Sequence, residues 1–104
     1  MLTQVATTKV EKLAYRLMWS VYKLEHAQRP VDRKVAQAEL SGMCKAASAL
    51  GFGHTDTHVE MMVRDVYRMV PAFVYSPTNA RSRVEWESAT VRELSRQLIS
   101  QRSA

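Results

Sequence analysis

Residues 8–28 read TKVEKLAYRLMWSVYKLEHAQ, and this stretch decides the fold. At about 100° per residue, its aliphatic side chains fall into one stripe that suits the core of a helical protein. That stripe consists of Val10, Leu13, Ala14, Leu17, Val21 and Leu24. Three further large side chains, Tyr15, Trp19 and Tyr22, fall on another side of the same helix. We therefore expect a helix that is either enclosed by several neighbours or exposes aromatic rings to a partner.

The composition is that of one compact, helix-rich domain. The 104 residues are 46% hydrophobic and 24% charged, with only three Gly and three Pro, which is typical of a globular chain. A chain of this size buries roughly two-thirds of the surface of its unfolded form, enough for a core of its own. We predict a single helical domain over residues 1–104.

Three more segments show helical periodicity. The second follows Pro30, which suits a first turn, and ends before Gly51, which suits the left-handed position after a helix. The third is the most apolar, and the fourth carries a narrower stripe. We predict an all-α fold, a compact antiparallel bundle of four helices, because the connections are mostly short. The approximate helix ranges are 8–28, 31–50, 58–75 and 83–101.

Capping boxes mark three of the four predicted helix starts. In this motif a Ser or Thr hydroxyl accepts a hydrogen bond from the third helical amide, and a Glu three residues later accepts one from the cap's own amide. The pairs are Thr8 with Glu11, Thr57 with Glu60, and Ser82 with Glu85. Each precedes a run of apolar residues at helical spacing, which favours helix starts at these places.

Net charge and cysteine content limit which partners and which cellular compartment we expect. The formal net charge of +5 permits attraction to nucleic acid, but acids are mixed with the basic residues throughout. The single cysteine, Cys44, cannot form an intramolecular disulfide, so we expect a cytoplasmic protein. No stretch resembles a signal peptide or reaches the length of a membrane span, and no membrane partner is predicted.

Potential metal ligands are densest just before the third helix, at His54, Asp56 and His58. Imidazole and carboxylate groups bind zinc and related metals, but alternate residues share one side only in an extended chain. Because a helix begins here, these residues are weak metal candidates, and we predict no cofactor.

Cys44 is expected to pack in the core rather than to act as a nucleophile. Since no catalytic motif is present, the chain is predicted not to be an enzyme.

The strongest candidate binding surface is the outer face of the first helix, where aromatic side chains alternate with cations. Its residues are Lys12, Tyr15, Arg16, Trp19, Tyr22 and Lys23. Because Trp, Tyr and Arg often anchor protein interfaces, we predict a non-enzymatic interaction or regulatory protein. It would bind a protein partner, or itself as a homodimer, through this aromatic-basic face. Trp86 lies off the stripe of the fourth helix and forms a secondary patch that a symmetric dimer would bury.

Three alternatives remain open. The rings of Tyr15, Trp19 and Tyr22 could pack inside the bundle, where such side chains are common. Nucleic-acid binding through the same face and the basic residues of the fourth helix ranks below protein binding, because the charge pattern is mixed. A small-molecule pocket between helices, lined by methionines and aromatic residues, ranks third.

Overall fold

The computed structural model describes residues 8–69 and 80–101, and four α-helices make up most of these ranges. The helices are α1 (Lys9–Glu25), α2 (Pro30–Ala49), α3 (Asp56–Met69) and α4 (Ala80–Ser100). The predicted all-α four-helix bundle is thereby confirmed. Part of the third predicted helix, residues 70–75, lies outside the described residues.

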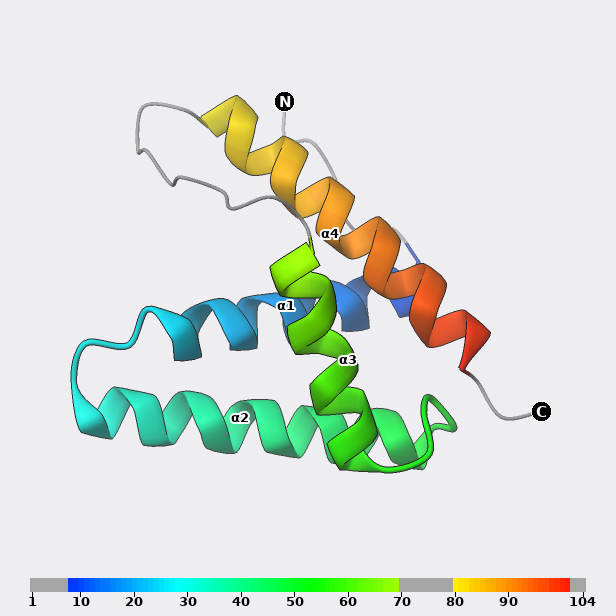
Figure 1. Cartoon of the computed structure of the whole chain (residues 1–104), viewed down its shortest axis with the longest axis horizontal. Coiled ribbons are helices and arrows are strands. Elements are labelled where there is room, and N and C mark those ends of the chain that lie inside the picture. The colour runs from blue at the N-terminus through cyan, green and yellow to red at the C-terminus, as the bar shows by residue number, and fades with distance from the viewer. Residues whose placement is uncertain (1–7, 70–79, 102–104) are drawn as a thin grey trace.

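α1 is the central helix of the bundle. It runs antiparallel to α2, while α3 and α4 cross this pair obliquely (Figure 1). α1 contacts all three other helices, and α4 packs on both α1 and α3. A helix with three neighbours buries more than one stripe of side chains, which explains the apolar surplus of residues 8–28.

The capping box at Thr8 is present as predicted. The Glu11 amide donates to Thr8 Oγ1 at 3.1 Å, and the Thr8 amide donates to Glu11 Oε1 at 3.0 Å. At its other end α1 stops at Glu25 and not at residue 28. The amide of His26 donates to the carbonyl of Tyr22, and the chain then turns toward α2.

The predicted starts of α3 and α4 are wrong by two or three residues. α3 begins at Asp56, and the amide of His58 donates to Thr55 Oγ1 at 3.1 Å, so Thr55 rather than Thr57 forms the cap. Glu60 is used elsewhere, because its carboxylate pairs with Arg64 at 2.9 Å. α4 already includes residues 80–82, since neither Ala nor Arg opposes helix formation before the expected cap.

The C-terminus of α2 has the predicted glycine-based ending. Gly51 adopts a positive φ of 91°, and its amide donates to the carbonyl of Ser48 at 3.0 Å. The amide of Phe52 donates to the carbonyl of Ala47 at 3.0 Å, and the Phe52 side chain is buried. These two bonds define a Schellman motif, which satisfies carbonyls at the helix end.

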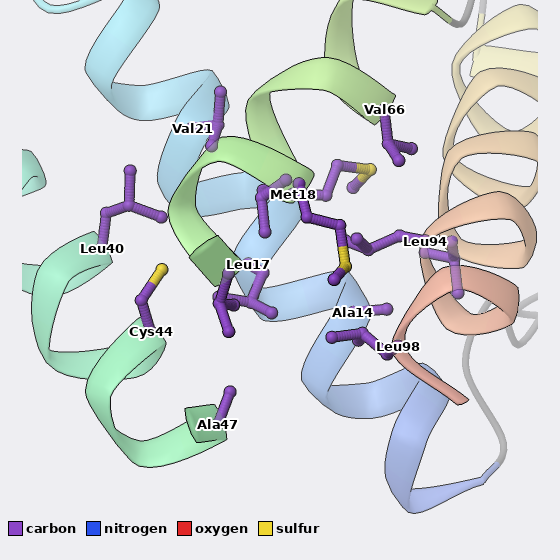
Figure 2. Close-up of a cluster of buried hydrophobic side chains, with 14 of the residues drawn as sticks. Ala14, Leu17, Met18, Val21, Leu40, Cys44, Ala47, Val66, Leu94 and Leu98 are labelled. Carbon is purple, nitrogen blue, oxygen red and sulfur yellow. The ribbon is translucent and has the colours of Figure 1, made fainter. Parts of the chain in front are cut away.

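The core lies between all four helices. Figure 2 shows side chains that converge from α1, α2, α3 and α4 into one buried cluster. Its labelled members are Ala14, Leu17, Met18, Val21, Leu40, Cys44, Ala47, Val66, Leu94 and Leu98. Most of the aliphatic stripe predicted for the first helix is buried, including Ala14, Leu17 and Val21. Because this side of α1 is buried in the core, only its other side is left for contacts outside the core.

Candidate interaction surface

The aromatic residues of α1 form a continuous row. The ring centroids of Tyr15 and Trp19 are 6.2 Å apart, and those of Trp19 and Tyr22 are 4.8 Å apart, both with edge-to-face geometry. The ring of His26 stacks on Tyr22 with a centroid distance of 4.1 Å and an interplanar angle of 18°. Edge-to-face pairs are the favoured arrangement of such rings, so each ring of the row supports the next.

Two residues from other helices extend this row into a cluster. Trp86 of α4 lies 6.3 Å from Tyr22 and 5.7 Å from Tyr67 of α3, measured between ring centroids. Tyr15, Trp19 and Tyr22 are partly buried and pack against the core. The structure thus places the three predicted aromatic anchors together, but each of the three rings is only partly exposed.

The expectation that Trp86 forms a surface patch is wrong, because Trp86 is only 8% exposed. The predicted stripe of the fourth helix is narrow, whereas α4 lies against both α1 and α3. Its buried strip is therefore wider and includes polar residues. Those buried side chains of α4 are Trp86, Glu87, Thr90, Val91, Leu94, Ser95 and Leu98.

Sequence reasoning did not identify Tyr67 as a member of this cluster. Tyr67 follows the buried Val66, and a rotation of about 100° brings it beside Trp86. Burial is the main cause that raises the pKa of the Tyr67 phenol, and the nearby Glu25 carboxylate and Tyr22 raise it further. The phenol therefore stays protonated at neutral pH and serves packing.

The three predicted cations of α1 remain exposed. Lys23 Nζ lies 2.6 Å from Glu39 Oε2, which joins α1 to α2 across the surface. Lys12 and Arg16 form no ion pair within residues 8–69 and 80–101. The predicted face is thus divided into half-buried rings and solvated charges.

A groove lies where the end of α1 meets the start of α2, and we call it the α1–α2 groove. It has a volume of about 400 Å³. Its lining residues are Tyr22, Lys23, His26, Ala27, Asp32, Val35, Ala36 and Glu39. Val35 is 55% exposed, and Val31, one turn earlier on α2, is 57% exposed. Two members of the predicted face, Tyr22 and Lys23, therefore border an apolar surface that the sequence analysis did not single out.

A second hollow, of about 640 Å³, lies along α2 and the end of α1. Four of its seven lining residues are polar or charged. The lining residues are Leu24, Pro30, Arg33, Lys34, Gln37, Ala38 and Ser41. Arg33, Lys34 and Ala38 are themselves solvent-exposed. Three of its lining residues, Arg33, Lys34 and Gln37, have long side chains that would lose rotamer freedom on binding a ligand.

The weak metal candidates His54, Asp56 and His58 lie at the start of α3. The imidazole rings of His54 and His58 are 5.1 Å apart between centroids, but His58 Nδ1 accepts a hydrogen bond from the His54 amide at 3.3 Å. That bond occupies one of the two imidazole nitrogens in a local contact. Among residues 8–69 and 80–101, no three His, Cys, Asp or Glu side chains are grouped so that they could hold a metal ion.

Cys44 lies in the core beneath α1 and α3 and has no exposed surface. Burial, together with the carboxylates of Glu60 and Asp56, raises the pKa of its thiol to about 12. A nucleophilic cysteine requires a lowered pKa and access to a substrate. Cys44 has neither, so its geometry supports a packing role.

Comparisons with family models, curated proteins and solved structures found no match to this chain. The roles of its residues therefore rest on the geometry given above. Within the part of the chain that the structure describes, no helix is both long enough and apolar enough to cross a membrane.

Proposed function

We propose that this chain is a non-enzymatic interaction protein that binds a protein partner, or a second copy of itself, at the α1–α2 groove. The observation that carries the proposal is the exposure of Val31 and Val35, 57% and 55%, beside this groove. Covering apolar surface is favourable by about 25 cal/mol per Å², so exposed valines beside a concave surface suit a partner's apolar side chains.

The groove has the anatomy of a small interface, with an apolar centre and a charged rim. Tyr22 and His26 form one wall and Val35 the other, while the Lys23–Glu39 ion pair lies at the rim. An amphipathic helix or an apolar peptide fits such a groove, because its apolar side can cover the valines and leave its polar side in water.

The aromatic row contributes to this site mainly through Tyr22. Trp19 and Trp86 pack edge-to-face on Tyr22 at 4.8 Å and 6.3 Å between centroids, and His26 stacks on it. A side chain held by three neighbours has little conformational freedom left to lose when a partner binds. Tyr15 and Trp19 are therefore supporting residues, and Tyr22 is the anchor at the groove.

Photo-crosslinking in cells tests this proposal, because the reaction captures whichever protein lies against the groove. A benzophenone amino acid at position 35 is expected to yield a discrete protein adduct in cells that express the chain, because this side chain lies at the groove. The control position is 99, since Ile99 is equally exposed, at 60%, on α4. The adduct at position 35 should disappear when Val31→Asp is added. Equal adducts at both positions, or none at position 35, would contradict the proposal.

Nucleic-acid binding is the second candidate, and one observation favours it. Lys9, Lys12 and Arg16 follow one another along the exposed side of α1, and Lys12 and Arg16 make no ion pair among the described residues. Such cations can contact phosphates. The half-buried rings beside them are already packed edge-to-face, however, which leaves little open ring surface for stacking on bases.

A gel-shift assay separates the two candidates. Under the leading proposal we expect no retarded band with single-stranded or duplex DNA or RNA at about 50 mM salt. A band that weakens steeply as salt rises, and that disappears in the Lys12→Ala, Arg16→Ala double variant, would instead support nucleic-acid binding. The matched control is Arg68→Ala, which removes an exposed charge from α3, a helix outside the face proposed to bind nucleic acid.

A further inference from the structure

The outer face of α2 is a heptad-like seam that nothing in the described chain covers. Opposite its buried side, exposed residues follow one another at spacings of four, three, four, three and four. They are Val31, Val35, Ala38, Gly42, Lys45 and Ala49. Five of the six are apolar or Gly, and this spacing is the one that places side chains along a contact between two helices. We call this set the α2 seam.

Gly42 gives a second reason to regard the seam as a contact surface. A Cβ atom built on Gly42 meets no atom within 4 Å, so no described neighbour requires a glycine there. Glycine destabilises a helix interior relative to alanine, and it allows the close approach of another backbone. A second helix against the seam could approach closely at Gly42, whereas no neighbour does so within the described chain.

Charges along the two borders of the seam identify the partner. Lys34 lies on one border, and Asp32 and Glu39 lie on the other, at the positions that flank a heptad contact. A second copy of α2 in parallel orientation, related by a two-fold axis along the helices, places the basic border of each copy against the acidic border of the other. An antiparallel pair places like charges together.

We propose that this chain forms a weak parallel homodimer through the α2 seam, with Lys34 of each copy beside Glu39 of the other. This inference rests on the proposed function, because Val35 belongs to both surfaces and Val31 lies one turn from it. Glu39 already pairs with Lys23 but keeps 45% of its side chain exposed, so its carboxylate can accept from a second cation. One helix pair is a small interface, and Lys45 would face its own copy, so association is weak.

Sedimentation equilibrium over about 10 µM to 1 mM tests the association, a range that suits interfaces of this size. We expect a monomer–dimer equilibrium that Val35→Asp shifts fully to monomer. Lys34→Glu should weaken the dimer roughly ten-fold, and the double variant Lys34→Glu, Glu39→Lys should restore it, since the charges are then only exchanged. Lys45→Ala should strengthen it. Ile99→Asp, also at an exposed apolar position, should change nothing.

Disulfide trapping tests the orientation. Val31→Cys is expected to form a disulfide between two copies in the parallel dimer, because position 31 then faces itself. In an antiparallel pair, position 31 would face position 49, roughly 27 Å along the helix from 31 of the partner. A mixture of Val31→Cys and Ala49→Cys would then give mixed disulfides. The native Cys44 does not interfere, because it is fully buried.

The outcomes distinguish this inference from the proposed function. A monomer at every concentration, or a dimer that ignores Val35→Asp and Lys34→Glu, overturns the homodimer through the α2 seam. Mixed disulfides overturn its parallel orientation. If the purified chain is monomeric while position 35 still gives an adduct with a different protein in cells, the proposed function stands and the homodimer does not. Circular dichroism of each variant separates lost association from lost folding.

Discussion

Replacing Trp86 with alanine is expected to lower the free energy of unfolding by about 3–5 kcal/mol, the range for deletion of a buried aromatic side chain. Trp86 is 8% exposed and contacts the rings of both Tyr22 and Tyr67, so it joins α4 to α1 and α3. Its removal leaves a cavity where these three helices meet. Urea denaturation followed by circular dichroism measures the loss.

Trp86→Phe is the matched control for this prediction. It keeps an aromatic ring against Tyr67 and removes less volume, so we expect a loss of about 1–2 kcal/mol. A further control is Ile99→Ala, which shortens a 60% exposed side chain on the same helix and should cost less than about 0.5 kcal/mol. A loss below about 1 kcal/mol for Trp86→Ala would show that the ring is not buried.

Trp86 also shows where prediction from the sequence stops. The helical period identifies the side of α4 that faces one neighbour, and Val91, Leu94 and Leu98 are buried as that stripe requires. It does not reveal that a second neighbour lies beside this stripe. The burial of Trp86, and its contact with Tyr67 at 5.7 Å, depend on the oblique crossing of α3 and α4. That crossing is a property of the whole fold.

Local signals at the helix ends were informative to different degrees. The bonds that end α2 at Gly51 form within one segment, so glycine chemistry alone was sufficient to predict them. At the start of α3, Thr55 and Thr57 are both good caps. Thr55 forms the cap. Glu60, the expected capping partner of Thr57, instead pairs with Arg64 and accepts a hydrogen bond from Gln37 of α2. A contact between helices thus decided a local question.

The candidate site was predicted in part for the same reason. Tyr22 and Lys23 of the predicted face line the groove, but its apolar side comes from Val35 and Ala36 on α2, which were not among the predicted site residues. The helical period places Ala36, Leu40 and Ala47 on the core side of α2, and these residues are buried. It leaves Val31 and Val35 in solvent, but it does not show that Tyr22 of α1 lies beside Val35.

Two glycine substitutions are expected to change stability in opposite directions, and Gly53→Ala has the larger effect. Gly53 adopts a φ of +79°, a region that costs a non-glycine residue about 1–2 kcal/mol. An added Cβ would also lie 2.9 Å from both His58 Nδ1 and Val59 Cγ2. We expect a total loss of roughly 2–3 kcal/mol, because both strain and crowding oppose the change.

Displacement at Gly53 also affects α4. Its amide donates to the carbonyl of Gln101 at 3.2 Å, which ties the loop before α3 to the end of α4. We therefore expect Gly53→Ala to speed hydrogen exchange in the last turn of α4 as well as to lower the free energy of unfolding. Unchanged exchange in that turn would mean that the loop absorbs the added methyl group without moving this bond.

Gly42→Ala is the matched substitution, in a glycine of ordinary helical conformation with open space around its Cβ position. In dilute, monomeric protein it should raise the free energy of unfolding by about 0.5–1 kcal/mol, because alanine has the higher helix propensity. Urea denaturation of both variants at one low concentration compares them directly. Each substitution adds the same methyl group. The opposite signs of the two changes in the free energy of unfolding therefore follow from the backbone conformation and the space around each glycine. Two losses of equal size would contradict the geometry at Gly42.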